Sequence, residues 1–185
     1  MPHPCITAQT FPHKPAIIMG GSGEMVTYRQ LDERSNQGAQ LFRSLGLKAG
    51  DHIALMMENN ARFLEICWAA QRSGLIFTPI ATHLKRDETE YVLSNCGASL
   101  FIGSHPLKEA AIHAKEDASG VEHFLMVGGI TDGFDSWEEA LSLQAAAPVE
   151  DEQNGVPMLY SSGTTGQPKG VLVPPPSEED DTPPM

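Results

Sequence analysis

Short apolar runs alternate with amphipathic stretches of ten or more residues along most of this chain, and that alternation strongly restricts the possible folds. The expected strands are residues 53–57, 75–80, 99–103 and 124–127, and the expected helices are residues 61–73, 87–95, 107–117 and 136–146. Strands separated by helices of this length are typical of βαβ units, in which successive strands are parallel. The sequence therefore predicts an α/β fold with a mostly parallel sheet flanked by helices.

A β-hairpin is expected in front of this alternating part. Two short apolar runs, residues 15–19 and 25–28, flank a glycine-rich turn, which is the pattern of two antiparallel strands. Thr27 and Gln30 then fit a capping box, in which the two side chains satisfy free N–H groups at a helix start. Apolar and small residues recur at helical spacing over residues 31–45, so an amphipathic helix is predicted to follow the hairpin.

Composition is that of an ordinary globular protein and disfavours several classes of partner. The chain has 185 residues, of which 41% are hydrophobic and 19% charged, enough to form a packed core. The formal net charge is −12, and residues 150–185 carry half of it, with seven acidic residues and one base, Lys169. An acidic chain without a basic patch lacks the charge that binds nucleic acid or anionic membranes.

The cysteines, histidines and N-terminus indicate neither a metal site nor secretion. Cys5, Cys67 and Cys96 form no Cys-x-x-Cys pair, and the seven histidines do not cluster with them. The N-terminus lacks a basic segment followed by an apolar one, and no apolar stretch approaches the length of a membrane span. We therefore expect a soluble protein in the reducing cytoplasm, without a transmembrane segment.

One segment requires a chemical explanation. Residues 161–170 read Ser-Ser-Gly-Thr-Thr-Gly-Gln-Pro-Lys-Gly, and strands are expected beside them at residues 157–162 and 171–173. Glycines let backbone N–H groups turn toward an anion, and hydroxyl groups add donors that suit phosphate oxygens. The candidate residues for binding nucleotide phosphates are Ser161, Ser162, Gly163, Thr164, Thr165, Gly166 and Lys169.

Two other phosphate-binding motifs do not fit this segment. A Walker A pattern aligned on Gly163 requires glycine in place of Pro168 and a hydroxyl residue in place of Gly170, and it leads into a helix. The dinucleotide fingerprint G-x-G-x-x-G follows none of the expected strands. A flexible hairpin turn without a ligand is the remaining alternative to a phosphate loop.

The segment resembles the phosphate-binding signature of the AMP-forming acyl-CoA synthetases, which belong to the adenylate-forming (AMP-binding) ligase family. The similarity extends to residues 27–32 (TYRQLD), 50–55 (GDHIAL) and 68–74 (WAAQRSG), so that it covers about residues 11–173. Residues 79–84 look more like the CoA ligase branch than like the amino-acid-activating domains of peptide synthetases. The resemblance implies the N-terminal part of the large domain of such a ligase.

The resemblance also implies a two-step reaction. A carboxylic acid, fatty or related, attacks the α-phosphate of ATP to give an acyl-adenylate and pyrophosphate, and the thiol of CoA then displaces AMP. The loop would hold the β- and γ-phosphates, with Lys169 as a counter-charge to the leaving pyrophosphate. ATP, Mg2+ and CoA are the implied cofactors of the full-length enzyme, a small-molecule carboxylic acid is its substrate, and no catalytic residue is assigned.

Enzymes of this family are much longer, and their adenine, ribose and magnesium residues and small C-terminal domain follow the phosphate loop. We therefore expect residues 1–173 to form a partial N-terminal AMP-binding domain, and the acidic, proline-rich residues 174–185 to form a disordered tail. A ligase fragment, inactive by itself, is favoured over a short natural product that acts as a non-catalytic nucleotide-binding or subunit-interaction module. An unfinished sheet would expose an edge strand, which favours self-association.

Overall fold

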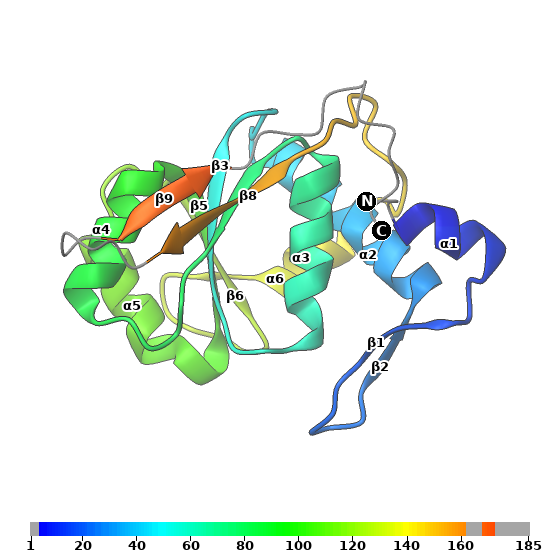
Figure 1. The fold of residues 1–185 in the computed structure, drawn as a ribbon, viewed down its shortest axis with the longest axis horizontal. Coiled ribbons are helices and arrows are strands. Elements are labelled where there is room, and N and C mark those ends of the chain that lie inside the picture. Colours follow the sequence, from blue (N-terminus) through cyan, green and yellow to red (C-terminus); the bar gives the residue numbers. More distant parts are fainter. Residues whose placement is uncertain (1–3, 162–167, 173–185) are drawn as a thin grey trace.

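The computed structural model describes residues 4–161 and 168–172, and within them seven strands form one sheet while two more form a separate hairpin. The hairpin pairs β1 (Pro15–Ile18) with β2 (Met25–Thr27) in antiparallel fashion and is separate from the sheet (Figure 1). The predicted tail, residues 174–185, lies outside the described residues.

The seven-stranded sheet of the described chain has the order β7-β6-β5-β3-β4-β8-β9. Its strands are β3 (His52–Met56), β4 (Ile76–Pro79), β5 (Ala98–Ser104), β6 (His123–Val127), β7 (Asp135–Ser136), β8 (Val156–Ser161) and β9 (Lys169–Leu172). Neighbours from β7 to β8 are parallel, whereas β8 and β9 pair antiparallel. The predicted α/β class, the mostly parallel sheet and the N-terminal hairpin are confirmed.

Helices cover both faces of this sheet. They are α2 (Tyr28–Ser44), α3 (Ala61–Arg72), α4 (Arg86–Cys96), α5 (Lys108–Asp117) and α6 (Trp137–Ser142), with a 3-10 turn η1 (His105–Leu107) before α5. A further helix, α1 (Pro4–Thr10), packs against α2. Ile53 and Leu55 of β3 pack with α2, α3 and α6, and the alternate residues Ala54 and Met56 pack with α4 and α5. Because both faces are buried, the strands consist of continuous apolar runs.

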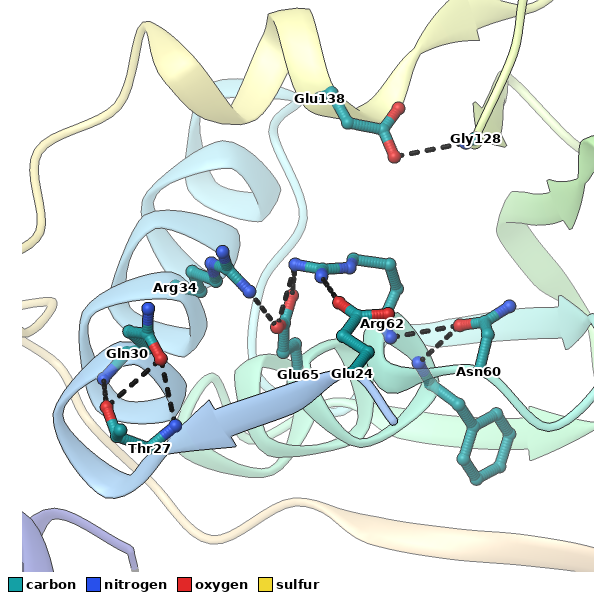
Figure 2. Close-up of polar contacts among 10 residues, drawn as sticks. Glu24, Thr27, Gln30, Arg34, Asn60, Arg62, Glu65, Gly128 and Glu138 are labelled. Atoms are coloured by element: carbon teal, nitrogen blue, oxygen red, sulfur yellow. Dashed lines mark hydrogen bonds and ion pairs between the residues drawn. The ribbon is translucent and has the colours of Figure 1, made fainter. Parts of the chain in front are cut away.

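The start of α2 follows the predicted capping box. The Gln30 N–H donates to Thr27 Oγ1 at 3.3 Å, and the Thr27 N–H donates to Gln30 Oε1 at 2.9 Å (Figure 2). The predicted end of α4 is also confirmed, because Gly97 follows the helix with a left-handed φ of 65°. These local signals placed the two helix ends correctly.

A buried carboxylate joins the hairpin to the body of the molecule. Glu65 of α3 lies between Arg34 of α2 and Arg62, with N–O distances of 2.7 and 2.9 Å, and Arg62 also pairs with Glu24 at 2.5 Å (Figure 2). Burial raises the pKa of the Glu65 carboxyl, and the two arginines oppose that shift. The buried Glu65 and the side chains of Arg34, Arg62 and Glu24 therefore connect α2, α3 and the hairpin.

The structure differs from the sequence prediction at three elements. Helix α1 and strand β7 were not predicted, and α6 ends at Ser142 rather than continuing to Ala146. Beyond α6, the chain turns toward α2, where Gln37 Nε2 donates to the Gln144 carbonyl and Gln40 Nε2 donates to the Ala147 and Pro148 carbonyls. Tertiary hydrogen bonds therefore take the place of the last predicted helical turn.

Candidate functional site

The strands that flank the candidate phosphate loop in the sequence, β8 and β9, lie at one edge of the central sheet (Figure 1). β8 first pairs parallel with β4, at Ile76 with Val156 and at Phe77 with Pro157. Farther along, β8 pairs antiparallel with β9. Because β8 runs parallel to the central strands, its end lies at their carboxyl edge, where open α/β sheets bind ligands.

The structure describes two of the seven predicted phosphate-binding residues. Ser161 ends β8 and Lys169 begins β9; the two are partners across the antiparallel ladder, and both are exposed. The other five lie outside the described residues: Ser162, Gly163, Thr164, Thr165 and Gly166. The predicted strand–loop–strand arrangement is confirmed at its two ends, and it differs from a Walker A loop, which leads into a helix.

A cavity of about 450 Å³ lies beside the ends of β8 and β9. Its walls come from the segment after β4, from α4, and from the residues that flank the loop, including Tyr160, Ser161 and Pro168. Most of the lining side chains are apolar, and His83 and Glu88 add ionisable groups. The cavity therefore lies between α4 and the residues that flank the loop, Ser161 and Pro168.

The segment that leads into β8 is anchored by arginines that the sequence pattern did not single out. Arg43 Nε lies 3.1 Å from Asp151 Oδ1, and Arg72 Nε lies 3.4 Å from Glu152 Oε1. The Gln153 N–H donates to the Arg72 carbonyl at 3.1 Å. Two acids of the acidic C-terminal region are thus paired with arginines of α2 and α3, and the start of β8 is held against the end of α3.

A second polar group connects the carboxyl ends of β3 and β5, which are adjacent strands. Ser104 Oγ donates to Glu58 Oε2 at 2.5 Å, and Asn60 Nδ2 donates to Glu58 Oε1 at 2.9 Å. Burial opposes ionisation of Glu58, but the hydrogen bonds from Ser104 and Asn60 outweigh it and lower the pKa of this carboxyl. The ionised Glu58 side chain therefore stabilises the edge of the sheet where β3 and β5 end.

Replacing Ser104 with alanine is expected to raise the pKa of Glu58, because it removes one of the hydrogen bonds that lower it while burial still opposes ionisation. A carboxyl whose pKa is lowered by folding stabilises the folded state above its unfolded pKa, and that stability is lost as pH falls through the folded pKa. Ser104→Ala should therefore reduce the loss of stability on acidification. Carbon-detected NMR titration of Glu58 measures the shift, with Ser99→Ala as a control on the same strand; an unchanged pKa in Ser104→Ala would contradict the assignment.

The described residues contain no cluster of metal-ligating side chains. Within residues 4–161 and 168–172, no group of three or more His, Cys, Asp or Glu side chains could hold a metal ion. Burial raises the pKa of the Cys67 thiol to about 12, so this cysteine is not a nucleophile near neutral pH. No helix in the described part of the chain has the length and hydropathy that crossing a membrane requires.

The arrangement is that of an α/β domain with a mostly parallel sheet, in which a glycine- and hydroxyl-rich sequence joins the two strands at one edge. The chain belongs to the AMP-binding enzyme family, whose model matches residues 6–174. Over 180 residues it is 32% identical to the crotonobetaine/carnitine–CoA ligase of Escherichia coli O1:K1 / APEC, and the match covers 90% of this chain. The chain spans about a third of that relative's length, 34%.

Solved structures of CoA ligases share this fold. The anthranilate CoA ligase AuaEII, in complex with anthranoyl-AMP, superimposes with a TM-score of 0.80 at 25% identity, over 91% of this chain and 34% of the ligase. A fatty acyl CoA synthetase from Mycobacterium tuberculosis gives a TM-score of 0.75 at 27% identity, over 92% of this chain and 33% of that protein. The fold is therefore that of the N-terminal part of adenylate-forming ligases, as the sequence resemblance implied.

Proposed function

We propose that this chain supplies the nucleotide phosphate-binding part of an AMP-forming acid–CoA ligase, in which the loop between β8 and β9 holds the β- and γ-phosphates of ATP. The supporting observation is the antiparallel stem of the loop, with Ser161 opposite Lys169 at the carboxyl edge of a parallel sheet. Both residues belong to the segment that resembles the family's phosphate-binding signature. The similarity to CoA ligases, including one in complex with anthranoyl-AMP, an acyl-adenylate, supports the same reaction.

In the proposed reaction, a carboxylate oxygen of a fatty or related acid attacks the α-phosphorus of ATP. The bond from that phosphorus to the bridging oxygen breaks, and pyrophosphate leaves with the electron pair. The CoA sulfur then attacks the acyl carbon, and AMP leaves. Lys169 and the donors of the loop, Thr164 and Thr165 among them, hold the leaving phosphates in line and offset their growing charge.

The proposal is tested by carboxylate-dependent exchange of labelled pyrophosphate into ATP. The gene product, purified from cells that express it, is assayed with fatty, aromatic and carnitine-like acids. We expect exchange that depends on one class of acid, followed by release of AMP when CoA is added. Absence of exchange with every acid, in a folded product, would contradict the ligase proposal.

A second candidate function is a non-catalytic module that binds nucleotide phosphates or another subunit. The observation that favours it is the exposed apolar edge of the sheet, where Leu159, Val171 and Leu172 are 50%, 51% and 47% exposed. Exposed apolar edge strands favour association with another chain, including a second copy. Binding of pyrophosphate without exchange, together with a dimer in sedimentation velocity, would favour this candidate over the ligase.

A further inference from the structure

The paired strands β8 and β9 form the stem of the candidate phosphate loop, and Tyr160 links this stem to helix α4. It is the residue before Ser161 in β8, and its side chain packs with the apolar cluster that includes Val92 and Leu93 of α4. Its hydroxyl group donates to Asn95 Oδ1 at 2.6 Å. The residue that leads into the candidate phosphate loop is therefore tied to the last turn of α4.

The Tyr160 ring also limits the size of the residue that fits opposite it in β9. Gly170 is the ladder partner of Tyr160, and a Cβ atom at position 170 would lie 3.1 Å from Tyr160 Cζ and 3.2 Å from its hydroxyl oxygen. That Cβ would also overlap Met158 Cε. Gly170 does not have a left-handed φ, so the space occupied by the Met158 and Tyr160 side chains, rather than turn geometry, accounts for the glycine in β9.

The hydrogen bond to Asn95 persists across the physiological pH range. Burial, with smaller contributions from Cys96 and Tyr91, raises the pKa of Tyr160 to about 12. The hydroxyl group therefore keeps its proton near neutral pH, and it remains the donor to the Asn95 carbonyl oxygen. An Asn side chain accepts through this oxygen without any change of charge.

We propose that Tyr160, Asn95 and Gly170 form a clamp that holds both strands of the phosphate-loop stem against α4, with Tyr160 and Asn95 as positioning residues. Tyr160 lies over Gly170 of β9 and is tied to α4 by its hydroxyl group, so one side chain fixes the loop's entry and exit strands together. Donors that are aligned in advance bind an anion with a smaller loss of conformational entropy. The claim that the clamp tightens phosphate binding rests on the proposed function. The claim that the clamp fixes β8 and β9 against α4 does not.

Tyr160→Phe tests the clamp because it removes the hydroxyl group and keeps the ring. Hydrogen exchange of the backbone amides in β8 and β9 is expected to become about threefold to fivefold faster, the effect of losing one modest hydrogen bond. Exchange in β3 and β5 should not change. Asn95→Leu should give the same acceleration, and the double variant should add little to either single one, because both remove one interaction.

The matched control is Tyr91→Phe, which removes a hydroxyl group from the same apolar cluster without a hydrogen bond to a described side chain. Gly170→Ala keeps both hydrogen-bonding groups but crowds the side chains of Met158 and Tyr160, and it should also accelerate exchange in β9. Unchanged exchange in Tyr160→Phe and Asn95→Leu, or an equal acceleration in Tyr91→Phe, would overturn the clamp.

The affinity for inorganic pyrophosphate, measured by calorimetry on the same variants, tests the positioning role. Tyr160→Phe should raise the dissociation constant by about the same threefold to fivefold factor, and Tyr91→Phe should leave it unchanged. Faster exchange with an unaltered dissociation constant would reject the positioning role. If the unsubstituted chain binds no pyrophosphate, the proposed function fails, and the exchange data still decide whether the clamp exists.

Discussion

In the full-length enzyme, replacing Lys169 with alanine is expected to slow acyl-adenylate formation about a hundredfold while changing the free energy of unfolding by less than about 0.5 kcal/mol. Lys169 is exposed at the start of β9, and its side chain makes no hydrogen bond or ion pair with another described residue. Little folding energy is therefore lost with the side chain. The rate of acyl-adenylate formation depends on the Lys169 side chain, because a fixed cation stabilises the charge that develops on the leaving pyrophosphate.

The measurement is the rate of carboxylate-dependent pyrophosphate exchange, with urea unfolding followed in parallel. Lys48→Ala provides a matched control, since Lys48 is an exposed lysine in the segment between α2 and β3. Lys169→Arg should recover part of the rate, because it restores the charge with a different shape. An exchange rate in Lys169→Ala equal to that of Lys48→Ala would remove Lys169 from the proposed phosphate site.

Much of the fold follows from local sequence signals. The capping box at Thr27 and Gln30 placed the start of α2, and the alternating pattern gave β3 to β6 with their helices in the correct order. Such signals work because capping and burial on one side of a helix are determined by residues close in sequence. The strand–loop–strand character of the candidate site was predicted in the same way, from apolar runs on both sides of the loop.

Contacts between distant residues could not be predicted from one sequence. Asn95 and Tyr160 are 65 residues apart, and nothing in the polar end of α4 distinguishes Asn95 as the partner of a tyrosine in β8. The same is true of Arg72 and Glu152, which anchor the start of β8. Strand order decides which side chains meet, and it depends on how the helices pack on the sheet rather than on local propensity. Helix α6 was predicted too long for this reason, because its last turn is replaced by bonds from α2.

Gly155→Ala is expected to destabilise the fold by about 3 kcal/mol, at the upper end of what an added methyl group costs in a packed site. Gly155 is buried immediately before β8, and its N–H donates to the Gln71 carbonyl at 2.6 Å. A Cβ atom there would overlap the Leu75 carbonyl oxygen and lie 2.7 Å from the Ala70 carbonyl oxygen. Both are backbone atoms at the junction of α3 and β4, so they move only if that junction moves.

Urea unfolding measures this loss, and Gly21→Ala is the control, because nothing lies within 4 Å of a Cβ atom added at this turn position. The strain should also be seen at the site, since β8 pairs with β4 over its first two residues and carries the loop at its other end. Gly155→Ala should therefore weaken pyrophosphate binding even under conditions where the variant is fully folded. A loss of stability no greater than in Gly21→Ala would show that the α3–β4 junction yields to the methyl group, and that β8 is not rigidly seated against it.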